Sequence, residues 1–332
     1  MKVTGILNID KPAGITSYDV VDVIKKVFAG SKVGHTGTLD PVATGVLPIL
    51  IGDATKLSDE LTAENKSYRV KMLLGVETDT YDITGRIMYA SVVKHDDIYI
   101  RERIKRFIGK QEQIPPLYSA IKIDGKRAYE YARQGKNVEL KPRLIEIYDI
   151  NNIAVDLRRH EVTFDVYCTK GTYVRSLVND IGKKIGCGAT MIELTRLKNG
   201  NFKIEDSIKL YDFLKLDFEE MKKKVIPIED YYFDLKKIMM TREQFSKFSN
   251  GVKIEVDDQD KLVRVYCNGK YKGLGQIKDK ILKRFIIEWI YQRGLSIGTV
   301  FFDIILTIFC LTNNIIWYSI LMLKKGWLIW QF

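Results

Sequence analysis

Hydrophobic and polar residues alternate along two separated segments of the chain, residues 67–74 and 161–169. In the first segment the apolar side chains share one face, formed by Tyr68, Val70, Met72 and Leu74. This period of two is typical of an antiparallel strand that buries one face, because successive side chains point to opposite sides. Residues 3–9 are a further strand candidate, and residues 46–51 form an apolar run short enough to be a buried strand.

Apolar residues recur at the helical period in three other segments. The first follows a capping box at residues 16–19, where a hydroxyl and a carboxylate satisfy the first free N–H groups. The second covers residues 101–109 and ends at Gly109, with an inward face of Ile104, Phe107 and Ile108. The third ends at Gly186 and carries the stripe Val174, Leu177, Val178 and Ile181. Strands interspersed with helices predict the α+β class.

The C-terminal third divides into two parts. A charged stretch at residues 215–224 marks a boundary, and residues 262–277 contain two strand-like runs around Asn268 and Gly269, which is a hairpin signal. We therefore predict one domain over residues 1–225 and a small, mostly β domain over residues 228–283.

Residues 284–332 differ from the rest in composition. Between residues 296 and 323 the only charged side chain is Asp303, and this span is long enough to cross a bilayer. Asn313 and Asn314 lie in its middle, where amides are costly in lipid. Apolar tails also arise when an AT-rich gene is read past a frameshift. We favour such a non-native extension over a membrane anchor or a buried helix.

Composition restricts the possible partners. The chain has 332 residues, a formal net charge of +11 and a pI of about 9.2, which favours a polyanion such as nucleic acid or an anionic membrane surface. None of the four cysteines forms a CxxC pair, so neither a zinc site nor a redox dithiol is expected. The N-terminus has no signal peptide, and we expect a cytoplasmic protein with reduced thiols.

The densest candidate chemistry lies in residues 34–56, which combine Gly, Thr, an imidazole and one carboxylate, Asp40. Glycine lets a ligand come close to the backbone, and Pro41 fixes the chain directly after the acid. An isolated acid in a loop is usually solvated or caps a turn. Its semi-apolar surroundings weaken this interpretation and leave a functional carboxylate as the alternative.

Four further features have a functional and a plain interpretation. Lys11 precedes a helix, where it either meets a phosphate or is solvated, and Tyr68 is either core or a plate for a base. Arg175 lies in the first turn of a helix, a position that disfavours a cation. It therefore either pairs with a nearby anion or is a surface residue with no partner. Residues 114–143 mix three tyrosines with seven basic residues, which suits nucleic-acid gripping or a solvated basic face.

Five stretches follow one another along the chain: residues 8–21 (NIDKPAGITSYDVV), 34–56 (GHTGTLDPVATGVLPILIGDATK), 67–85 (SYRVKMLLGVETDTYDITG), 114–135 (IPPLYSAIKIDGKRAYEYARQG) and 168–182 (CTKGTYVRSLVNDIG). In this order they resemble the signature of the TruB family of tRNA pseudouridine synthases. The resemblance covers about residues 1–283. It implies a pseudouridine synthase fold with a central, mainly antiparallel sheet flanked by helices, an RNA-gripping thumb at 114–143 and a PUA-like RNA-binding domain.

The resemblance also implies an activity and its residues. The enzyme would isomerise uridine 55 in the T loop of tRNA, acting as a monomer without metal or nucleotide cofactor. The catalytic aspartate falls on Asp40 and its basic partner on Arg175, while Tyr68 would stack on the flipped base. The other substrate-binding positions implied or suggested are His35, Tyr173, Leu194 and Lys11.

The chemistry agrees with these residue types. Moving the glycosidic link from N1 to C5 needs an ionised nucleophile, which a carboxylate beside an arginine can be. A base inside a folded loop must also be extruded into a pocket. Two alternatives are a non-catalytic tRNA-binding or chaperone protein on the same scaffold and a membrane-tethered modifier. A nucleotide-binding enzyme is disfavoured because residues 34–37 match no phosphate-loop motif.

Overall fold

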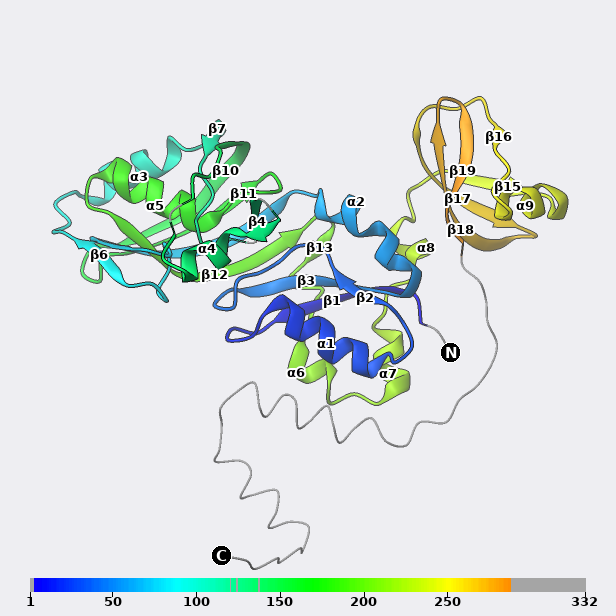
Figure 1. Cartoon of the computed structure of the whole chain (residues 1–332), viewed down its shortest axis with the longest axis horizontal. Helices are drawn as coiled ribbons and strands as arrows, with labels where there is room; N and C mark the ends of the chain where they lie inside the picture. The colour runs from blue at the N-terminus through cyan, green and yellow to red at the C-terminus, as the bar shows by residue number, and fades with distance from the viewer. Residues whose placement is uncertain (1–2, 120, 124, 137, 288–332) are drawn as a thin grey trace, which may run out of the picture.

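The computed structural model describes residues 3–287 apart from residues 120, 124 and 137. Within these residues a ten-stranded, mainly antiparallel sheet forms the body of the molecule (Figure 1). Its strands, in spatial order, are β14 (Ile208–Lys209), β1 (Gly5–Lys11), β3 (Thr44–Ile51), β12 (Ala189–Asn199), β4 (Lys66–Leu74), β11 (Glu161–Cys168), β10 (Arg143–Asp156) and β7 (Gly109–Gln113). Two short strands flank this path, β2 (Val33–His35) on β3 and β13 (Phe202–Lys203) on β12.

Helices cover the sheet (Figure 1). The helices of the body are α1 (Ser17–Val27), the 3-10 helix η1 (Gly52–Leu57), α2 (Ser58–Thr62), α3 (Asp97–Lys105), α4 (Ala128–Arg133), α5 (Val174–Ile185), α6 (Leu210–Phe213), α7 (Phe218–Lys223) and α8 (Ile228–Tyr231). Two small hairpins join them, β5 (Val76–Thr78) with β6 (Ile87–Ala90) and β8 (Lys122–Ile123) with β9 (Lys126–Arg127).

A second, five-stranded sheet follows in the C-terminal part of the described chain. Its strands and helix are β15 (Lys237–Met240), α9 (Arg242–Ser249), β16 (Ile254–Glu255), β17 (Lys261–Cys267), β18 (Lys270–Lys278) and β19 (Ile281–Ile287). The hairpin predicted around Asn268 and Gly269 is present, since β17 and β18 pair as antiparallel strands on either side of these residues. Both residues adopt the positive φ that such a tight turn requires. The last strand runs past residue 283, where the sequence pattern had placed the end of this part.

Three clusters of buried apolar residues hold these elements together. The largest joins α1, α3, α5 and α6 to one face of the large sheet, and another lies inside the second sheet. A third lies between the two sheets and contains Ile6 and Leu50 of the large sheet with Leu274 and Ile286 of the small one. Strand β3 is therefore buried on both faces, which explains its uninterrupted apolar run.

The α+β class and the alternating strands are confirmed: β4 alternates between fully buried and more exposed side chains as its sequence period predicts. The helix predicted over residues 101–109 is wrong in its bounds, since α3 is capped by Asp96 and ends at Lys105. Ile108 follows that end and is 44% exposed instead of buried. Gly109, with φ of +117°, begins β7 and does not stop the helix.

The apolar tail predicted from residue 284 lies, from residue 288 on, outside the described residues. None of the helices in the described part of the chain has the length and apolar character needed to cross a membrane.

The contact between β3 and β12 generates a prediction about stability. Gly45 has φ of +100°, and a Cβ there would overlap the backbone of Arg196. Gly45→Ala should lower the free energy of unfolding by about 3 kcal/mol, because overpacking adds to the cost of a left-handed residue. Gly30, with φ of +84° and open space around it, is the matched control, and Gly30→Ala should cost only about 1 kcal/mol. Denaturant unfolding measures both, and equal losses would contradict the steric argument.

Candidate active site

Residues 36–43 form an irregular loop between β2 and β3, and the start of α1 holds its first half in place. The Ser17 hydroxyl accepts from the Leu39 N–H at 2.8 Å and donates to the Leu39 carbonyl at 3.2 Å. The Pro41 carbonyl accepts from the Gly14 N–H at 2.8 Å. Asp40 lies between these two fixed residues, so its backbone position is determined on both sides.

Strand β12 holds the two ends of the same loop. The Asn199 amide donates to the Thr36 hydroxyl at 2.8 Å, and the Thr195 and Thr44 hydroxyls are 2.9 Å apart. Arg196 joins both ends, because its Nε donates to the Val46 carbonyl at 2.6 Å and its Nη2 to the Gly37 carbonyl at 3.2 Å. Its side chain is fully buried and pairs with no carboxylate among the described residues. Burial lowers the pKa of Arg196, and the neighbouring Tyr68 opposes this shift.

Arg175 is the second residue of α5 and contacts Asp40 directly. Its Nε lies 2.8 Å from Oδ2 of Asp40, and its Nη2 donates to Oδ1 at 3.2 Å, which makes the pair bidentate. The remaining N–H groups donate to the carbonyl of Thr80 at 3.1 Å and to that of Tyr118 at 3.0 Å, and approach Asp82 at 3.5 Å. The predicted need of Arg175 for an anion is thus met by two carboxylates.

Asp82 reaches this site because the turn that follows β5 is fixed to β12. The Ile83 N–H donates to the Met191 carbonyl, and the Met191 N–H donates to the Tyr81 carbonyl. One oxygen of Asp82 accepts from the Thr84 N–H at 2.9 Å and from the Thr80 hydroxyl at 2.8 Å. Its side chain is only 6% exposed, whereas that of Asp40 is 33% exposed. Of the two acids, Asp40 is therefore the one open to a ligand.

Tyr68 and Leu194 lie on β4 and β12, two neighbouring strands of the large sheet. Tyr68 of β4 lies opposite Arg196 of β12 in the strand register and is 8% exposed. Burial raises the pKa of its hydroxyl, with Asp40 contributing in the same direction, so the ring is a neutral phenol near the carboxylate. Leu194 is 6% exposed, and its carbonyl accepts from the Thr44 hydroxyl at 3.4 Å.

Tyr173 and His35 lie at the edges of the site. Tyr173 caps α5, and Gln113 holds it by accepting from its N–H at 2.8 Å and donating to its carbonyl at 3.1 Å. Burial raises the pKa of the Tyr173 hydroxyl. His35 ends β2 and accepts from the Gly37 N–H through Nδ1 at 3.2 Å. Burial lowers the pKa of His35, which favours the neutral ring.

Lys11 lies below the loop and not on the surface. It is 0% exposed, and its ammonium donates to the carbonyls of Ile15 at 2.7 Å, Pro12 at 2.9 Å and Pro41 at 3.3 Å. Burial lowers its pKa to about 8. The sequence left open whether Lys11 contacts a phosphate. The buried position argues against such a contact, because the ammonium group has no exposed surface. Its place is to fix the turn that follows Asp40.

Sequence reasoning missed two of these residues. Neither residue is singled out by the sequence patterns: Asp82 lies within the stretch of residues 67–85, and Arg196 lies in none of the five stretches. The one local signal for Asp82 is its position between two threonines, Thr80 and Thr84, which satisfy its carboxylate. Across the described residues, no group of three or more His, Cys, Asp or Glu side chains lies close enough to hold a metal ion.

Comparisons with known proteins identify the class of this fold and site. The family model described as "TruB family pseudouridylate synthase (N terminal domain)" matches residues 25–174, and the "tRNA pseudouridylate synthase B C-terminal domain" matches residues 175–234. These two matches place the chain in the class of pseudouridylate synthases. The first match contains the loop of Asp40, and the second begins at Arg175.

Curated relatives agree with both matches. The chain is 44% identical to the tRNA pseudouridine synthase B of Clostridium kluyveri, over 85% of this chain and 99% of that protein. It is 47% identical to the enzyme of the same name from Clostridium tetani, over 82% and 95% of the two chains. The protein belongs to the TruB family.

Solved structures resemble the fold as well. A structure of an H/ACA RNP bound to a substrate RNA containing 2'-deoxyuridine has a TM-score of 0.59 at 27% identity, covering 82% of this chain and 77% of that chain. A crystal structure of a Cbf5–Nop10–Gar1 complex has a TM-score of 0.57 at 29% identity, covering 82% and 78%. The predicted fold is thereby confirmed.

The shared guanidinium leads to a prediction for Asp82. Asp82→Asn removes one of the two carboxylates that share Arg175, so Arg175 should hold Asp40 more tightly and leave it less free to react. Turnover should fall about tenfold, which corresponds to about 1.4 kcal/mol of added attraction between Arg175 and Asp40. RNA affinity should stay unchanged, because Asp82 is buried. Asp79, which pairs with Arg86 in the same turn, is the control. An equal loss in Asp79→Asn would show that the turn and not the charge is responsible.

Proposed function

We propose that the protein isomerises uridine to pseudouridine in tRNA, at uridine 55 of the T loop, with Asp40 as the nucleophile. The observation that carries the proposal is the bidentate pair of Asp40 and Arg175 on a loop fastened at both ends, with one third of the Asp40 side chain exposed. The names of the curated relatives support the reaction and the tRNA substrate.

The reaction moves one bond and one proton. The N1–C1′ bond breaks, C1′ bonds to C5, the C5 proton leaves to solvent, and N1 regains a proton. A carboxylate can carry this reaction by forming a covalent bond that is later broken. Arg175 keeps Asp40 aligned, since its donors are already oriented before the substrate arrives.

The surrounding residues would bind the extruded base. Tyr68 would stack on it, an interaction of about 1–3 kcal/mol per base. Tyr173 and Leu194 would close the pocket, and His35 would occupy the space that the base leaves in the loop. The neutral state favoured for His35 and Tyr68 suits contact with uncharged base faces.

The basic segment 114–143 would grip the RNA as a thumb. Its first residues are tied to the active site, because the Ser176 hydroxyl donates to the Ile114 carbonyl and Arg175 donates to the Tyr118 carbonyl. RNA bound by the segment would thus lie close to Asp40. The body over residues 1–225 would perform the reaction, and the part over 228–283 would be a PUA-like RNA-binding domain.

The test of the nucleophile is Asp40→Asn. Tritium release from tRNA labelled at uridine C5 should be seen with the wild type and fall below detection in the variant, whose tRNA affinity should stay within about twofold. The isosteric amide cannot act as an anionic nucleophile but keeps the shape of the side chain. Residual turnover in Asp40→Asn would contradict the assignment. A wild type that binds tRNA tightly without release would favour a non-catalytic tRNA-binding or chaperone protein.

A second variant separates catalysis from phosphate binding at Arg175. Arg175→Met should lower tritium release by at least a hundredfold with little change in tRNA affinity, because it removes the bidentate partner of Asp40. Circular dichroism and thermal unfolding should accompany the assay, since two carboxylates lose their buried partner. A loss of affinity with normal turnover at saturating tRNA would make Arg175 a phosphate contact.

A further inference from the structure

Three basic side chains near the candidate active site are buried: Lys11, Lys66 and Arg196, which are 0%, 6% and 1% exposed. A buried charge is costly unless it is paired. Lys66 donates to the carbonyls of Thr62 and Glu64, and Lys11 and Arg196 likewise donate to carbonyls. In the part of the chain that the structure describes, none of the three has a carboxylate within salt-bridge distance. Their positive charge is therefore held by neutral groups.

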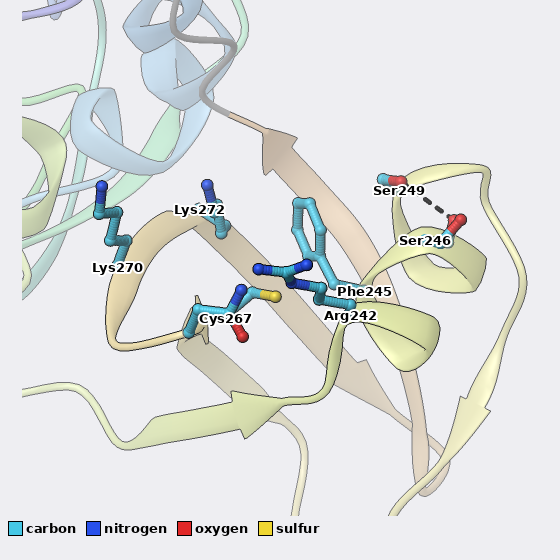
Figure 2. Close-up of a pocket in the computed structure, with 8 residues that line it drawn as sticks. Arg242, Phe245, Ser246, Ser249, Cys267, Lys270 and Lys272 are labelled. Carbon is cyan, nitrogen blue, oxygen red and sulfur yellow. Dashed lines mark hydrogen bonds between the residues drawn. The ribbon is translucent and has the colours of Figure 1, made fainter.

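Basic side chains of the small sheet show the more usual arrangement. Arg242, Lys270 and Lys272 surround a hollow of about 660 Å³ that opens to solvent (Figure 2). Water and salt screen charges in such a place, so their effect falls off quickly with distance. A charge enclosed by protein is screened much less. The buried cations near the active site can therefore act on groups that they do not contact.

The charge of Arg196 acts on the side chains around the pocket. Burial is the main cause that lowers the pKa of His35 and of Lys66, and the charge of Arg196 is the second. The same charge also lowers the pKa of the buried Lys11. Burial raises the pKa of the Tyr68 hydroxyl, and Arg196 opposes this rise. Arg196 thus places a positive potential beneath the side of the pocket that Tyr68 forms.

The candidate nucleophile is held by a different arginine. Asp40 pairs with Arg175 at 2.8 Å and has no hydrogen bond or ion pair with Arg196. Arg196 instead lies opposite Tyr68 in the pairing of β12 with β4. One guanidinium therefore lies beside the carboxylate, and the other lies next to the ring on which the base would stack.

We propose that the buried charge of Arg196 stabilises the uracil ring as an anion when the N1–C1′ bond breaks. This inference rests on the proposed function, which supplies the reaction. The electron pair of the broken bond stays on the ring, where N1, O2 and O4 share the charge, until C5 bonds to C1′. The C5 proton then leaves to solvent and N1 takes up a proton, so the ring ends neutral.

Negative charge therefore moves, for part of the reaction, from the carboxylate beside Arg175 to the ring above Tyr68. A fixed cation on that side lowers the barrier, because it need not reorient while the charge moves. Arg196 is buried beneath Tyr68 and acts without touching the base. It is thus a positioning residue for charge and not a catalytic residue.

The experiment uses two T-arm hairpins that differ only at the target nucleotide, which is uridine in one and 5-fluorouridine in the other. Fluorine withdraws electrons and stabilises the ring anion by itself, so the second hairpin should depend less on Arg196. The test variant of the full chain is Arg196→Gln, which removes the charge and keeps an amide donor for a loop carbonyl. Single-turnover consumption of the target nucleoside is followed by chromatography after digestion, and hairpin affinity is measured separately.

Arg196→Gln should consume uridine about tenfold or more slowly but 5-fluorouridine less than about threefold more slowly, with hairpin affinity within about twofold. Arg196→Lys keeps the charge, so the ratio of its two rates should match that of the wild type. The matched control is Arg264→Gln in the small sheet. Arg264 is 8% exposed and also donates to carbonyls, those of Leu235 and Phe233. Its loss should leave both rates within about twofold of the wild type.

Equal losses on the two hairpins in Arg196→Gln would overturn the inference, because they would show that Arg196 only holds the loop. A changed ratio in Arg196→Lys would overturn it as well. Should Arg196→Gln not fold, Lys66→Gln decides in its place, since it removes charge from the same buried group. It should slow uridine about threefold and leave 5-fluorouridine unchanged, and equal losses would again overturn the inference.

This design also separates the two proposals. If the wild type consumes neither nucleoside, the proposed reaction fails whatever the variants do. If the wild type consumes both and the variants lose both equally, only the role of Arg196 is refuted.

Discussion

The guanidinium of Arg175 is the contact on which the site depends. Its partners come from three segments: the loop of Asp40, the turn that contains Thr80 and Asp82, and the segment of Tyr118. A buried cation is costly unless it is fully paired, so each of the three segments must be in place for α5 to bury Arg175. The same cost makes the three segments converge, although residues 40, 82 and 118 are far apart in the sequence.

Asp40 and Asp82 share one cation, Arg175, but differ in burial and in their other hydrogen-bond partners. Asp82 is buried, and threonine donors occupy the oxygen that does not face Arg175, so it is fixed. Asp40 is one-third exposed, and Arg175 is its only side-chain partner among the described residues. With one positive and two negative charges in contact, neither acid receives the full attraction of the arginine. In its proposed role as the nucleophile, Asp40 would therefore be held in place and still be available to react.

The sequence predicted the parts of this site that depend on local pattern. The alternation around Tyr68 gave its strand and its buried face, and the cation in the first turn of α5 indicated an anion near Arg175. Asp82 was missed because its burial depends on pairing with Met191, which is distant in the chain. Lys11 looked like a solvated turn residue for the same reason, since the Pro41 carbonyl that helps to bury it lies thirty positions away. Local pattern does not record contacts of this kind.

The two sheets are joined behind the active site, and this has a consequence for binding. Leu274 and Ile286 of the small sheet pack in one apolar cluster with Ile6 and Leu50, whose strands lead into and out of the site. A backbone pair between Ile6 and Ile226 adds two hydrogen bonds at the same place. A core contact of this kind holds the small sheet in place relative to the strands that carry the loop of Asp40. An RNA that contacted both the loop of Asp40 and the proposed PUA-like part would gain from a high effective concentration, because the second contact would form without a further loss of freedom between the two parts.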